Sequence, residues 1–185
     1  MAKFIPVQIK LLCLMYMGYA VSMIMKTSII VVSPSLISDP VFAMTKTQFG
    51  VILAYGSLGG ICGKVFFGWS TDRFGGSINF LFGLLMVSVG IFLFGFSVQL
   101  IVLSLLFASI SLAKAGGWPS IAKLTGNWYH PSQYGRVWGY ISTSSRTGTI
   151  IATVVLGYLL SVLPWRQVLY VAGVIGLAMV LVWFL

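Results

Sequence analysis

Four basic side chains occur inside long apolar stretches of this sequence, and their type and position could do chemistry. They are Lys26, Lys64, Lys114 and Arg146. A charged side chain at membrane depth is costly, so such a residue indicates a function by default. The whole sequence contains only two acidic residues, and neither falls within these apolar stretches. Cations that gather without a carboxylate predict a binding site for an anion.

The two kinds of cation suit different parts of an anion. Arginine presents a planar fork that binds a phosphate or carboxylate through two hydrogen bonds, whereas lysine presents a compact point charge. We therefore expect Lys26 and Arg146 to hold the anion. Lys64 and Lys114 add to the positive field, and Tyr19, on the same helical face as Lys26, supplies a hydrogen bond. A doubly charged phosphate ester balances these charges better than a neutral sugar does.

Each cation also has a structural interpretation. Lys64 lies eight residues before Asp72, or about 12 Å along a helix, so its long stem could reach the membrane surface. Lys114 and Arg146 lie near the middles of their stretches, where they could instead bond to backbone carbonyl groups. The choice depends on how each helix is rotated, which decides whether the four cations converge.

Long helices are needed to position these cations. Hydrophobic residues make up 59% of the 185 residues and charged residues only 7%, which is too few charges to cover a water-soluble domain of this size. A helix spans a bilayer with about 20 apolar residues, and continuous rather than alternating apolar stretches argue against strands. The sequence therefore predicts an all-α membrane protein with six transmembrane helices, over residues 9–32, 47–69, 78–97, 100–124, 137–160 and 168–185.

Basic residues near the helix ends predict the orientation, because cytoplasmic loops carry an excess of Lys and Arg. A cytoplasmic N-terminus places Lys3, Lys10, Arg73, Lys123 and Arg136 inside, and Lys46 and Arg166 outside. We therefore expect the N-terminus to be cytoplasmic. The last apolar stretch reaches residue 185 without a polar cap, and we expect the chain to be a piece of something longer.

Several other classes of protein do not fit this sequence. The cations are scattered singly through apolar stretches, which argues against a nucleic-acid-binding protein. There is one histidine and no plausible set of nucleophile, base and orienting group, so the sequence does not predict an enzyme. No metal-ligand spacing occurs, and no cofactor is expected.

The turn after the second predicted helix resembles a known signature. Gly68, Asp72, Arg73 and Gly75 match the G-x-x-x-D-R-x-G motif of the major facilitator superfamily. The resemblance implies twelve helices in two six-helix halves, each a 3+3 inverted repeat, and a gating role for the motif on the cytoplasmic side. Residues 1–185 would then form a single six-helix bundle, with repeat units of about 1–98 and 99–185, and the C-terminal half would be absent from this chain.

A second resemblance narrows the family. The stretch from the fourth into the fifth predicted helix is similar to the organophosphate:phosphate antiporters, which include glucose-6-phosphate and glycerol-3-phosphate transporters. The matching residues are Gly117, Trp118, Pro119, Lys123, Trp128, Pro131, Ser132, Gln133, Gly135, Ser142, Thr143 and Ser144. Tyr19 precedes Lys26 as a tyrosine precedes the family's substrate-binding arginine, and Lys64 matches a lysine of the family's second helix. Lysine at position 26 and a charge at position 114 depart from the family's pattern, which implies a changed substrate within the anionic class.

This resemblance implies a secondary active transporter in the plasma (inner) membrane. It would move an organic phosphate or a related small anion by alternating access, in exchange for inorganic phosphate. Its partners would be that anion, the lipid bilayer, and either the missing C-terminal half or a second copy of the chain. Two alternatives remain open: a carboxylate or hexuronate symporter of the same superfamily, and a truncated six-span membrane protein without transport activity of its own.

Overall fold

The computed structural model describes residues 4–184, and the regular elements in that range are helical. The first three spans are α1 (Pro6–Val31) with α2 (Ser33–Ile37), α3 (Lys46–Phe74), and α4 (Gly76–Phe96). The fourth span consists of α5 (Leu100–Lys114) and α6 (Gly117–Trp128). The fifth contains a 3₁₀ turn (Pro131–Gln133), α7 (Tyr134–Ile151), a π-helical turn (Ala152–Leu156) and α8 (Gly157–Val162), and the sixth is α9 (Trp165–Phe184).

Six helical segments in the described range are long and apolar enough to cross a membrane. This confirms the predicted fold class and the approximate position of every span. Two of the spans are less regular than the sequence suggested. The fourth breaks after Lys114, where Gly116 and Gly117 favour the helix weakly. The fifth contains the π-helical turn, a local feature that often marks a functional position.

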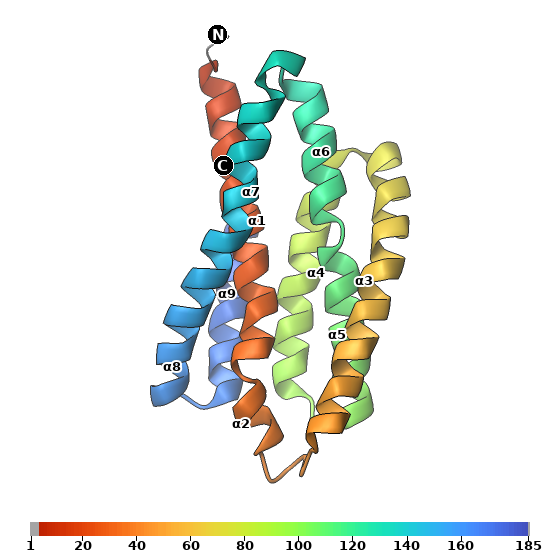
Figure 1. The fold of residues 1–185 in the computed structure, drawn as a ribbon, viewed down its shortest axis with the longest axis vertical. Coiled ribbons are helices and arrows are strands. Elements are labelled where there is room, and N and C mark those ends of the chain that lie inside the picture. Colours follow the sequence, from red (N-terminus) through yellow and green to blue (C-terminus); the bar gives the residue numbers. More distant parts are fainter. Residues whose placement is uncertain (1–3, 185) are drawn as a thin grey trace.

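The chain reverses direction at the two ends of the bundle. Figure 1 shows the start of α1, the α3–α4 turn and the α6–α7 turn at one end, and the α2–α3 loop and the α8–α9 turn at the other. The predicted cytoplasmic residues Lys10, Arg73, Lys123 and Arg136 therefore belong to the first end. Lys3 of the same group lies outside the described residues.

Local sequence explains where α3 begins and ends. The Thr45 hydroxyl accepts a hydrogen bond from the backbone N–H of Gln48, and the Gln48 side chain accepts one from the backbone N–H of Thr45. These reciprocal bonds satisfy donors that the first turn leaves free. Gly75 ends the helix with φ +88° and ψ 159°, a conformation essentially restricted to glycine. Both ends of this span are therefore fixed by single residues.

The helices pack in pairs around an apolar core. α3 lies against α5, α1 against α7, and α4 against both α5 and α9. In Figure 1, α1, α7, α8 and α9 occupy the left of the bundle, and α3, α5 and α6 the right. A Cβ atom on Gly148 of α7 would lie 2.4 Å from the carbonyl oxygen of Ala20 on α1. Only glycine permits so close an approach, so this contact sets the rotation of α1 and α7 relative to each other.

Candidate functional site

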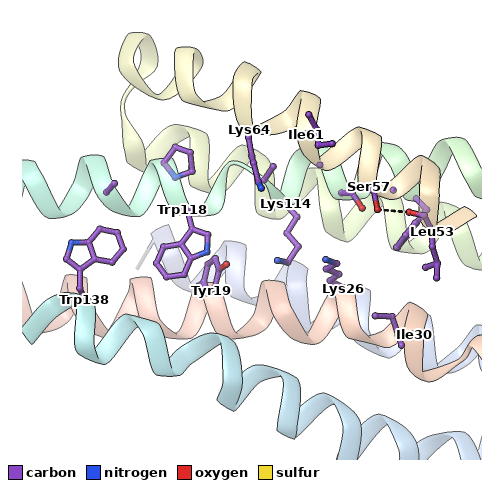
Figure 2. A pocket seen from close by; sticks show the side chains of 17 residues that line it. Tyr19, Lys26, Ile30, Leu53, Ser57, Ile61, Lys64, Lys114, Trp118 and Trp138 are labelled. Carbon is purple, nitrogen blue, oxygen red and sulfur yellow. Dashed lines mark hydrogen bonds between the residues drawn. The ribbon is translucent and has the colours of Figure 1, made fainter. Parts of the chain in front are cut away.

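A cavity of about 930 Å³ lies between the two sides of the bundle. Its wall includes Tyr19, Lys26, Lys64 and Lys114, which are four of the five predicted binding residues (Figure 2). The other lining residues are Ile30, Leu53, Gly56, Ser57, Gly60, Ile61, Phe107, Ser111, Ala115, Trp118, Pro119, Ala122 and Trp138. The structure thus brings together three cations that are far apart in the sequence.

The three lysines reach the cavity from three different spans. Lys26 lies half-buried on α1, and Lys64 is exposed on α3, where it projects from the opposite wall (Figure 2). Lys114 is the last residue of α5, immediately before the break in the fourth span. Within residues 4–184 none of these three side chains forms a hydrogen bond or an ion pair. All three ammonium groups therefore remain available to an anion.

Tyr19 holds Lys114 in position without neutralising it. The Lys114 Nζ atom lies 5.5 Å from the centroid of the Tyr19 ring, which is a cation–π geometry. Tyr19 is only 4% exposed, so the ring itself is firmly packed. A Cβ atom on Gly117 would lie 2.9 Å from this ring, so the glycine beside the break gives the ring its space. The break in the fourth span therefore positions both Lys114 and the ring beneath it.

Aromatic rings continue from Tyr19 along the wall of the cavity. The Tyr19 and Trp118 centroids lie 4.9 Å apart, and Trp118 and Trp138 stack with centroids 5.5 Å apart at 21°. Such a wall suits the apolar face of an organic ligand. The sequence marked Trp118 only as part of a family resemblance, and it did not single out Trp138. No local pattern could have found Trp138, because only the packing of α7 brings it to the cavity.

Neither carboxylate of the chain reaches this cavity. The Asp72 carboxylate lies 3.0 Å from Lys123 Nζ, in an exposed pair that joins α3 to α6. At the other end of the bundle, one Asp39 oxygen accepts hydrogen bonds from Trp165 Nε1 at 2.9 Å and from the Arg166 guanidinium at 3.2 Å. Since the sequence has only two acidic residues, nothing in it neutralises the three lysines.

The Asp39 cluster fixes the loop between the first two spans. The other Asp39 oxygen accepts a hydrogen bond from the backbone N–H of Val41 at 2.9 Å, and this bond is the main cause that holds the pKa of Asp39 below its usual value. Arg166 also donates to the carbonyl oxygen of Gly95 at 3.2 Å. The cluster therefore ties the α2–α3 loop to the end of α4 and the start of α9.

The predicted gating motif lies at the opposite end of the bundle. Gly68, Asp72 and their neighbour Thr71 line a second cavity of about 500 Å³ between α3 and α6. Arg73 lies over the Trp69 ring, with its guanidinium carbon 5.7 Å from the ring centroid. The motif therefore contacts α6 within this chain, while its predicted contacts with a second half stay a prediction.

Arg146 does not line the cavity. It lies on α7, and its side chain is exposed. The expected grouping of all four cations thus reduces, in this structure, to the three lysines. The reason is the rotation of α7, which turns Trp138 toward the cavity and Arg146 away from it.

Comparison with known proteins places this architecture among membrane transporters. The family model of the Major Facilitator Superfamily matches residues 15–185. A "Probable hexose phosphate transport protein" of Chlamydia pneumoniae is 28% identical over 95% of this chain and 38% of its own length. The "Membrane sensor protein UhpC" of Salmonella typhimurium is 27% identical over 94% of this chain and 39% of its own length. The "D-galactonate transporter" of Escherichia coli is 26% identical over 77% of this chain and 33% of its own length. The chain therefore spans well under half the length of these relatives.

Proposed function

Because this chain belongs to the Major Facilitator Superfamily, we propose that it forms one six-helix half of a secondary active transporter for an organic phosphate or a related small anion. Membership of that superfamily also agrees with the expectation that the chain is not an enzyme. The observation that carries the proposal is the convergence of Lys26, Lys64 and Lys114 on one cavity that no carboxylate of the chain reaches. The similarity to hexose phosphate transport proteins supports the same class of substrate.

In this proposal the lysines and the aromatic wall bind different parts of the substrate. Lys26, Lys64 and Lys114 surround the phosphate as point charges, which attract it in a cavity where low-dielectric walls strengthen the field. The stacked rings of Trp118 and Trp138 contact the organic part. The separation of a cationic region from an aromatic region favours an ester over inorganic phosphate alone.

Alternating access requires the cavity to be closed in turn from each side. We propose that a second six-helix half packs against the open side of the cavity, and that rocking of the two halves exposes it alternately to the two faces of the membrane. Each half would consist of two three-span units, here about residues 1–98 and 99–185. The Asp72–Lys123 pair would keep the gating motif aligned with α6 during this motion. The N-terminus would lie in the cytoplasm and the protein in the plasma membrane.

The test is uptake of radiolabelled phosphate into vesicles that contain the complete transporter. Removing one charge-assisted contact is worth about 1.5–3 kcal/mol, so Lys26→Met and Lys114→Met should each weaken phosphate binding by about 10-fold or more. Lys46→Met is the matched control, because Lys46 is an exposed lysine at the start of α3 and does not line the cavity. Unchanged uptake in both cavity variants would refute the proposal.

Two related functions are separated by the same vesicles. The relative named as a sensor suggests measuring binding as well as uptake, because a sensor would bind the anion without accumulating it. The similarity to a D-galactonate transporter favours a carboxylate as the second candidate substrate. Competition decides between the substrates: sugar phosphates should inhibit phosphate uptake at lower concentration than hexuronate or galactonate. Preloaded phosphate should accelerate uptake if the transporter exchanges phosphate.

A further inference from the structure

Arg146 lies near the middle of its span and cannot reach either membrane surface. The fifth span runs from Pro131 to Val162, so Arg146 is 15 residues from one end and 16 from the other. Each interval is about 22–24 Å of helix. Long basic side chains escape the apolar region only when they lie close to a helix end. The guanidinium therefore stays at membrane depth.

The Arg146 side chain points away from the rest of the bundle. Ser144 and Gly148 are buried, and Gly148 packs directly on the α1 backbone. Arg146 is two residues from each of them, which corresponds to a rotation of about 200° around the helix. The exposed position of Arg146 agrees with this geometry. Another molecule or segment must therefore cover this face of α7 or leave the charge in lipid.

Polar residues extend the same face along the fifth span. Ser142, Arg146, Thr149 and Thr153 follow one another at intervals of three or four residues, and we call them the α7 polar stripe. Three hydroxyls of the stripe donate to carbonyl oxygens one turn earlier: Ser142 to Trp138 at 2.6 Å, Thr149 to Ser145 at 2.9 Å, and Thr153 to Thr149 at 2.9 Å. These hydroxyls are satisfied within their own helix.

The guanidinium of Arg146 is the member of the stripe that needs an outside partner. Within residues 4–184 it has neither a hydrogen bond nor an ion pair, although it carries five donors. A water-filled cavity hydrates the three lysines, but Arg146 does not line that cavity. Its charge must therefore be balanced whether or not a small anion is bound, which favours a permanent partner.

A second copy of this chain cannot provide that partner. The two acidic residues of each copy, Asp39 and Asp72, lie at opposite ends of the bundle, and both are already paired with basic residues. A second copy would instead bring another arginine. The counter-charge must come from a membrane segment of different sequence.

We infer that the α7 polar stripe is an interface, and that its partner is a transmembrane helix outside these 185 residues that places an aspartate or glutamate against Arg146. The arginine fork binds a carboxylate through two parallel hydrogen bonds, which fixes the depth and rotation of the partner helix. The satisfied hydroxyls on either side present a small, polar surface suited to close helix packing. This contact concerns assembly and stands independently of the substrate of the cavity.

The test uses the protein expressed from its own gene in its native membrane, with Arg146→Gln, Arg146→Lys and Arg146→Glu variants. We expect Arg146→Glu to reduce the amount of folded protein at least tenfold, Arg146→Gln to lower its melting temperature in detergent, and Arg146→Lys to retain most of the stability. Lys46→Gln is the control for loss of one exposed cation. The decisive arm replaces each spanning Asp or Glu outside residues 1–185 by Lys in the Arg146→Glu background. One such replacement should restore folded protein to at least half of the wild-type amount.

Three outcomes would overturn the inference. The first is that no acidic position restores Arg146→Glu while Arg146→Gln melts like the wild type, which would show that Arg146 has no carboxylate partner. The second is an Arg146→Gln protein with unchanged melting temperature and a phosphate KM raised tenfold or more, which would make Arg146 a substrate-binding residue. The third is self-crosslinking of an Arg146→Cys variant in a background lacking Cys13 and Cys62, which would make the partner a second copy.

Discussion

The contact between α1 and α7 allows a sharp prediction, because one glycine controls it. In a Gly148→Ala variant the new Cβ atom would lie 2.4 Å from the Ala20 oxygen and 3.0 Å from its carbonyl carbon and Cα, whereas ordinary contacts are 3.4–4 Å. All three neighbours are backbone atoms, which no side-chain rotation can move. The two helices must therefore separate by about 1 Å or strain locally, and overpacking of this kind costs about 1–3 kcal/mol.

A second glycine of α7 supplies the control. A Cβ atom on Gly139 would meet nothing within 4 Å, so Gly139→Ala should only gain helix propensity, worth up to about 1 kcal/mol. In a protein of this size about 1 kcal/mol shifts the melting temperature by roughly 2–4 °C. We expect Gly148→Ala to melt several degrees below Gly139→Ala in detergent. Because α1 carries Lys26, phosphate uptake should also fall in Gly148→Ala alone. Equal melting temperatures for the two variants would refute the packing argument.

Three further substitutions test the ends of the helices by thermal melting. Asp39→Asn removes the ion pair with Arg166 and should cost about 1–3 kcal/mol at neutral pH. Since the pKa of Asp39 is lowered in the folded state, its contribution is complete above the ordinary aspartate pKa of about 4 and is lost as the pH falls through the lower folded-state value; the difference from wild type should therefore vanish in strong acid, and a constant difference would contradict this assignment. Gly75→Ala places a side chain at φ +88° and should cost about 1–3 kcal/mol, although no neighbour would clash; an unchanged melting temperature would contradict it. Ala43→Gly should do the reverse and stabilise by about 1 kcal/mol, because Ala43 has φ +41°, and a lower melting temperature would show that another contact decides there.

The sequence determined the class of the protein and the position of its spans. Bilayer thickness sets the length of an apolar helix, and lipid excludes irregular backbone, so continuous apolar stretches are sufficient evidence for the six spans. Composition alone also showed that the cations had too few acids to pair with, because only two acidic residues exist in the chain. The gating motif and the family resemblance were local patterns of the same kind, visible without any knowledge of packing.

Only the tertiary structure decided which cations share a site. Lys26, Lys64 and Lys114 meet because each helix is rotated by its packing, as Gly148 rotates α7 against α1 and Gly117 makes space for the Tyr19 ring. Hydropathy carries little information about that rotation in a membrane, because lipid-facing and core-facing residues are equally apolar. For the same reason the sequence placed Arg146 with the lysines and did not single out Trp138, whereas the fold turns Trp138 into the cavity and Arg146 toward a neighbour outside the chain.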